Sequence, residues 1–180
     1  MDIVAHTLWA AAGAAVLHRR HPLSRRTVAA MLALAALPDV LHLLPIAGWW
    51  VFSEGSFAAL RGYAIATPGQ EPGLPPSIQF GSHHLHCVMH SAPVAGLVTL
   101  IVWRARRAFW IPLLGWWSHI VIDVFTHSSG YYAVPVLYPF TERGFDGIAW
   151  TTPWFMVVNY LSLAGVGLWL LLSRRRANAR

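Results

Sequence analysis

Histidine and aspartate side chains interrupt the apolar stretches of this sequence. Such groups are costly inside segments of membrane-spanning length, so they usually have a function there. Imidazole nitrogens and carboxylate oxygens are ligands of zinc, and they also suit iron and manganese. A divalent cation would neutralise the carboxylates in apolar surroundings. The residues are His6, Asp39, His42, His86, His90, His119 and Asp123, with His127 just beyond the fourth apolar segment.

Spacing and depth both indicate that these side chains meet. His86 and His90 are four residues apart, so they project from one helix face, and His119 and Asp123 have the same spacing. An α-helix rises about 1.5 Å per residue, so the height of each polar residue above the nearest arginine cluster can be counted. Several of these residues, from different segments, come out at the same height of roughly 18–21 Å. The residues at that level are His6, Asp39, His90, Asp123 and, in the last segment, Asn159.

We therefore expect a divalent-metal site, with zinc as the first expectation and manganese or iron as alternatives. One ion is expected; two would fit phosphoester hydrolysis. A histidine or aspartate that the metal leaves free, His127 or Asp39, is the candidate general base and catalytic residue. His42, His83, His84 and Asn159 are candidates for the surroundings of the metal.

The elements that must position these residues are transmembrane helices. The chain of 180 residues is 56% hydrophobic and 11% charged, whereas a soluble domain carries about 25% charged residues. Its apolar runs have the length of membrane spans. We expect an all-α membrane protein, a bundle of five transmembrane helices in a single domain, 1–180. The helices are predicted at about 3–18, 27–50, 85–103, 108–126 and 154–173, with outer loops at 51–84 and 127–153.

Arginine clusters predict the orientation. They follow the first, third and fifth segments, which places all of them on one side of a five-helix bundle, and the positive-inside rule makes that side cytoplasmic. The N-terminus is then outside, the C-terminus inside and the site extracytoplasmic, in a multi-pass protein of the bacterial inner membrane. Clusters beside apolar runs indicate topology and not nucleic-acid binding. His18 and His21 lie on the cytoplasmic side among arginines and are excluded from the site.

The stretches around these residues resemble the membrane-bound metal-dependent hydrolase family (YdjM-like). The matching stretches are Met1–Ala10 (MDIVAHTLWA), Leu37–Pro45 (LPDVLHLLP), His86–Ser91 (HCVMHS) and Ser118–Phe140 (SHIVIDVFTHSSGYYAVPVLYPF). The resemblance implies a metal site of His6, Asp39, His86, His90, His119 and Asp123. Many members carry a second aspartate where this chain has Leu41, and His42 is the candidate substitute. The pattern is also distantly similar to the metal site of zinc-dependent phospholipase C.

A membrane-embedded hydrolase is the leading interpretation, because a metal-activated water at the outer leaflet would meet an ester or phosphoester. Its expected partners are membrane lipids and a lipid-like or amphipathic small molecule, or a periplasmic ester; the oligomeric state stays open. A non-catalytic protein with a structural metal is the alternative, since structural sites are closed by four ligands. A metal-ion or proton transporter is disfavoured, because the predicted cytoplasmic halves of the helices are almost entirely apolar.

Overall fold

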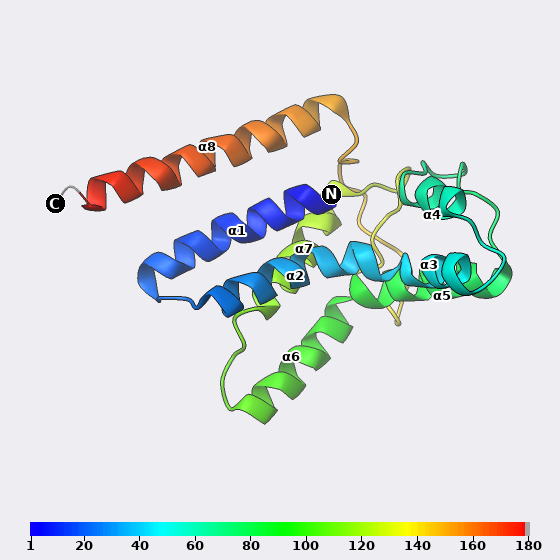
Figure 1. The fold of residues 1–180 in the computed structure, drawn as a ribbon, viewed down its shortest axis with the longest axis horizontal. Coiled ribbons are helices and arrows are strands. Elements are labelled where there is room, and N and C mark those ends of the chain that lie inside the picture. Colours follow the sequence, from blue (N-terminus) through cyan, green and yellow to red (C-terminus); the bar gives the residue numbers. More distant parts are fainter. Residues whose placement is uncertain (179–180) are drawn as a thin grey trace.

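The computed structural model describes residues 1–178, and across this range the chain is helical with no β-strand (Figure 1). The predicted all-α class is confirmed. The eight helices within these residues are α1 (Ile3–Arg20), α2 (Arg25–Leu41), α3 (Leu44–Phe52), α4 (Phe57–Ala64), α5 (Pro76–Met89), α6 (Ala92–Arg106), α7 (Leu113–Thr126) and α8 (Pro153–Asn178).

Helix α1 lies between α2 and α8, and α7 packs against both α1 and α2 (Figure 1). The closest approach of α7 to α2 is at Gly115, where a Cβ atom would lie 2.0 Å from the carbonyl oxygen of Met31. No other residue fits there without moving the backbone, so the glycine allows the two helices to touch. This contact holds the last turn of α2 beside the buried face of α7.

The helices predicted at 27–50 and 85–103 are each broken into two in the structure, so the expectation that each is continuous is wrong. Helices α2 and α3 meet at 64°, and α5 and α6 meet at 63°. A proline follows each break and lacks the N–H that would continue the helix. Pro45 cannot bond the carbonyl of Leu41, and Pro93 cannot bond that of Met89. The indole of Trp116 donates to the Met89 carbonyl instead, at 2.6 Å.

Other predicted boundaries also shift. The expected outer loop 51–84 contains α4 and the first turns of α5, which begins at Pro76. The fourth predicted helix, 108–126, begins at Leu113, directly after Pro112. The first and last predicted helices, 3–18 and 154–173, correspond to α1 and α8 with small extensions.

Helix α8 is long and apolar enough to cross a membrane over Pro153–Arg175. The bent pairs α2–α3 and α5–α6 bring the number of candidate spans to three if each pair makes one crossing. These candidates concern the described residues, and length and composition alone identify them. Five spans therefore remain a prediction, as does the orientation.

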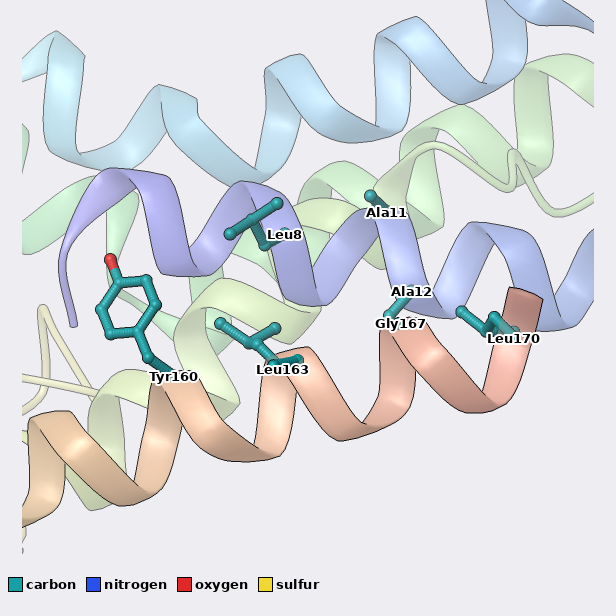
Figure 2. A pocket seen from close by; sticks show the side chains of 8 residues that line it. Leu8, Ala11, Ala12, Tyr160, Leu163, Gly167 and Leu170 are labelled. Carbon is teal, nitrogen blue, oxygen red and sulfur yellow. The ribbon is translucent and has the colours of Figure 1, made fainter. Parts of the chain in front are cut away.

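A groove of about 460 Å³ separates part of α8 from α1 (Figure 2). Its walls are apolar and several of its residues are small, so the two helices leave open space along their seam. One end of the seam is held by Arg19, which donates to the carbonyl of Leu170 at 2.9 Å and lies over the ring of Trp169. The groove is lined by Leu8, Ala11, Ala12, Tyr160, Leu163, Ala164, Gly167 and Leu170.

The segment between α7 and α8 folds back over the end of α7. Backbone N–H groups of Gly147, Ile148 and Trp150 donate to carbonyls of residues 125–127 at 2.8–3.0 Å. The same segment reaches the α5–α6 break, where the Ala92 N–H donates to the Val136 carbonyl at 2.8 Å. It thus covers the end of the bundle at which α2, α5 and α7 converge.

Candidate metal centre

Four side chains from three helices converge where α2, α5 and α7 meet. They are Asp39, His90, His119 and Asp123, and one potential ligand atom from each lies within 4.8 Å of all the others. His90, His119 and Asp123 have no exposed surface, whereas 18% of the Asp39 side chain is exposed. The group is therefore buried except on the side of Asp39.

Local structure explains why these residues meet. His119 and Asp123 are one helical turn apart on the buried face of α7. Asp39 follows Pro38 in the last turn of α2, which the Gly115 contact holds against α7. His90 is the C-cap residue of α5, directly after Met89, and its Nδ1 contacts the carbonyl of His86 one turn earlier. The site therefore depends on the predicted spacing of His119 and Asp123 on α7, and also on the break after α5, which was not predicted from the sequence.

Backbone carbonyls decide the tautomers of the two histidines. Nδ1 of His119 is 2.7 Å from the carbonyl oxygen of Ala35, and Nδ1 of His90 is 2.8 Å from that of His86. A carbonyl only accepts, so both Nδ1 atoms carry a proton and both Nε2 atoms are directed into the centre. Metal-bound histidines are oriented in the same way.

The two Nε2 atoms face each other at 3.0 Å. At this distance the two nitrogen atoms share either a proton or a bound cation. Oδ2 of Asp123 lies 3.1 Å from Nε2 of His119 and 3.4 Å from Nε2 of His90. Oδ1 of Asp39 is 3.6 Å and 3.7 Å from the same two nitrogens. Two nitrogen and two oxygen atoms thus surround one point.

Buried carboxylate oxygens point to the same conclusion. Oδ2 of Asp39 and Oδ2 of Asp123 are both buried without a hydrogen-bond partner among the described residues. A buried carboxylate oxygen without a hydrogen bond is costly, and a divalent cation would satisfy both oxygens. Two imidazoles and two carboxylates are also a donor set that zinc, manganese or iron accepts. The residues present therefore fit a divalent metal.

His6 and His127 lie on the other side of Asp123. Nε2 of His6 is 2.8 Å from Oδ1 of Asp123, and the His6 ring stacks on His119 with centroids 3.8 Å apart. Nε2 of His127 is 3.7 Å from the same Oδ1, and its Nδ1 donates to the Tyr132 carbonyl at 2.9 Å. The amino group of Met1 contacts both Asp123 and His127. The sequence-predicted His6 and His127 thus join the centre through one carboxylate oxygen.

His86 and His42 lie beside the four-residue group and not in it. The His86 ring is 4.2 Å from the His90 ring, centroid to centroid, and 5.7 Å from the His42 ring. The closest contribution of His86 is its carbonyl, which accepts from His90. His42 follows the end of α2, and its ring faces Tyr63 at 6.1 Å.

Three other predicted residues make contacts elsewhere. His83 is 58% exposed, with Nε2 at 3.9 Å from Glu142. Nδ1 of His84 lies 2.8 Å from the hydroxyl of Tyr138. Asn159 is buried, but it accepts from the indole of Trp9 at 2.9 Å and so joins α8 to α1. Depth in the membrane cannot distinguish Asn159 from a ligand, because residues at one depth can face any direction around the helix.

Sequence reasoning missed the backbone groups of the centre. The carbonyl of Ala35 orients His119, the carbonyl of Tyr132 orients His127, and the Met1 amino group contacts Asp123. Every residue type supplies a backbone carbonyl, so no residue pattern marks these contacts.

Comparison with known proteins identifies a family. Residues 1–179 match the family described as YdjM inner membrane protein. No curated protein and no solved structure matches the chain. The chain belongs to the YdjM inner membrane protein family, which supports a location in the inner membrane.

Proposed function

We propose that this protein is a membrane-embedded, metal-dependent hydrolase acting on an ester or phosphoester of a lipid-like or periplasmic substrate. The observation that carries the proposal is the convergence of Nε2 of His90 and Nε2 of His119, 3.0 Å apart, with two carboxylates whose Oδ2 atoms are buried without a hydrogen bond. Asp39, His90, His119 and Asp123 would hold the ion, zinc first, with manganese or iron as alternatives. A bound divalent ion would lower the pKa of water and polarise the scissile group.

Asp39 is the residue best placed to handle a proton. Its Oδ1 faces the two histidines, while its Oδ2 has no partner, and its side chain is the exposed member of the group. A carboxylate in this position can orient the attacking water and accept a proton from it. The other three members are wholly buried, so their function is to hold the ion in place.

The structure also supports a membrane face for this chemistry. Arg19 at the end of α1 contacts Leu170 near the end of α8, so two arginine-bearing helix ends lie together. Met1, at the opposite end of α1, contacts the centre. We propose that the five predicted segments cross or enter the membrane with the arginine-rich ends in the cytoplasm and the centre at the outer leaflet. An amphipathic substrate would then reach the Asp39 side from the lipid.

The test uses purified full-length protein in nanodiscs, assayed against matched fluorogenic phosphodiester and carboxylic-ester lipids. Wild type should hydrolyse one class, lose activity on chelation and regain it with added Zn²⁺ or Mn²⁺. Asp39→Asn should lower kcat by about 100-fold or more, the usual contribution of a general base.

His18→Ala is the matched control, because His18 lies at the arginine-rich end and accepts only from the Leu23 N–H. It should keep wild-type activity and metal content. Stoichiometric metal with no turnover of either substrate class would favour the structural-metal alternative. A folded wild-type protein that binds no divalent metal would contradict the proposal altogether.

A further inference from the structure

Asp123 presents its two carboxylate oxygens to two different sets of nitrogen atoms. Oδ2 faces His90 and His119, at 3.4 Å and 3.1 Å. Oδ1 faces His6 at 2.8 Å and His127 at 3.7 Å. A carboxylate with this arrangement can bridge two metal ions, because each oxygen can bind one ion.

We infer that the centre binds two divalent cations, with Asp123 bridging them and with His6 and His127 as protein ligands of the second. This second ion would lie on the Oδ1 side, opposite the one held by Asp39, His90 and His119. The inference deepens the proposed function, since it rests on the first ion being present, and it assigns His127 to metal binding and not to proton transfer.

The orientation of His127 fits this assignment. Its Nδ1 donates to the Tyr132 carbonyl at 2.9 Å, which leaves the Nε2 lone pair directed into the centre. This is the same arrangement that orients His90 and His119. The ring is also well shielded, because His127 is 8% exposed. A fixed, shielded lone pair of this kind suits a metal ligand.

The Oδ1 side already attracts positive charge. The amino group of Met1 forms an ion pair with Oδ1 of Asp123, and its nitrogen lies 3.2 Å from Nε2 of His127. A cationic nitrogen therefore contacts two of the three groups that we assign to the second ion. The third, His6, contacts the same oxygen and has no exposed surface on its side chain. Binding of the ion requires the amino group to move aside.

The alternative explanation is that His6 and His127 only hydrogen-bond to Asp123 and orient it. That role fits His6, whose Nε2 lies 2.8 Å from Oδ1, but it leaves Nε2 of His127 at 3.7 Å from Oδ1, too far for a hydrogen bond. A cation between Oδ1 of Asp123 and Nε2 of His127 accounts for the direction of the His127 ring.

Manganese titration of the purified full-length protein distinguishes the two explanations, because Mn²⁺ reports its neighbours by EPR without any turnover. Wild type should bind about two Mn²⁺ ions per chain. Its spectrum should show the narrower hyperfine spacing of an exchange-coupled pair. His127→Ala should bind one ion and show the spectrum of an isolated Mn²⁺. His84→Ala, which removes an exposed histidine of α5, should match wild type.

Each other outcome has a definite meaning. Saturation of wild type at one uncoupled ion would overturn the second site and leave the one-metal hydrolase standing. A coupled pair retained in His127→Ala would overturn the assignment of His127. No bound ion in folded wild type would overturn the proposed function as well. If His127→Ala does not fold, as judged by circular dichroism and gel filtration, His127→Gln and His6→Gln provide the same comparison with a smaller change in volume.

Discussion

Helix α7 is 14 residues long and lies inside the bundle, whereas α8 is 26 residues long and mostly exposed. Half of the residues of α7 are buried, and they include two of the four residues of the candidate metal centre. In the most apolar stretch of α8 only 11% of the residues are buried. Among the described residues of this helix, Asn159 is the buried polar one. Length and apolar composition therefore mark the exposed helix that could cross a membrane, while the shorter, closely packed helix carries half of the candidate metal centre.

The way each helix meets its neighbour accounts for this difference. Helix α7 touches α2 backbone to backbone at Gly115, which places polar side chains of two helices within reach of one another. Helix α8 meets α1 across an apolar groove with open space at Gly167 (Figure 2). Close contact is needed to surround an ion, and the α1–α8 seam does not provide it.

The largest expected effect comes from disrupting the backbone contact between α2 and α7. Gly115→Ala would place a Cβ 2.0 Å from the Met31 carbonyl, so the helices must separate, at a cost of at least about 3 kcal/mol. Metal binding should be lost with the contact. Gly167→Ala is the matched control, because a Cβ there meets nothing within 4 Å. It should be neutral or stabilise by up to about 1 kcal/mol. Thermal unfolding in detergent would measure both, and equal effects would refute the comparison.

Metal withdrawal should have the next largest effect, and it should act through α7. An ion bound only by the folded protein stabilises it by about 2.7 kcal/mol at 100 times Kd. Adding a chelator should therefore lower the Tm of wild type. Asp123→Asn should remove that response, because Asp123 is the shared buried carboxylate of the centre. Calorimetry with and without chelator checks this, and a Tm of Asp123→Asn that still responds to chelator would place the ion elsewhere.

Removing the polar contact of α8 should cost less and should spare the metal. Asn159→Ala deletes the hydrogen bond from the Trp9 indole at 2.9 Å, which is worth about 1 kcal/mol. Metal stoichiometry should stay at the wild-type value, since this contact joins α8 to α1 alone. Loss of metal from a folded Asn159→Ala protein would show that α8 supports the centre after all.

The smallest expected effect lies in the outer segments, at Glu71 and Tyr132. The Tyr132 hydroxyl donates to Glu71 at 2.6 Å and lowers the pKa of that carboxyl. A lowered pKa stabilises the folded state above the ordinary pKa of glutamate, and the contribution disappears as the pH falls through the folded value. Solvent screens this exposed pair, so Glu71→Gln should cost only a few tenths of a kcal/mol at neutral pH.

Stability measured at neutral pH and at about pH 3, below the ordinary pKa of glutamate, would check this prediction. Tyr132→Phe should behave like Glu71→Gln, and it keeps the Tyr132 carbonyl that orients His127. A difference between wild type and Glu71→Gln that grows in acid would contradict the sign of the effect.

Residue types and spacing predicted much of this protein. The four residues of the candidate centre were all identified, because charged and imidazole groups in apolar segments are few and helical spacing pairs His119 with Asp123. The all-α class and the approximate extents of α1 and α8 also follow from hydropathy. These features depend on local composition and on a fixed helical period, which the chain carries within a few turns.

Only the tertiary structure decided how those residues are grouped. His90 belongs to the centre, whereas the His86 ring lies beside it. Helix α5 ends just before His90, because Pro93 has no N–H to bond the carbonyl of Met89. Asn159 lies at the expected depth but accepts a hydrogen bond from the Trp9 indole, away from the centre. His127 donates from Nδ1 to the Tyr132 carbonyl, which directs its Nε2 toward the centre. Apolar segments of this composition do not reveal which way each helix faces or where it bends. Contacts between helices and backbone carbonyls determine both, and these are encoded by packing across the whole chain.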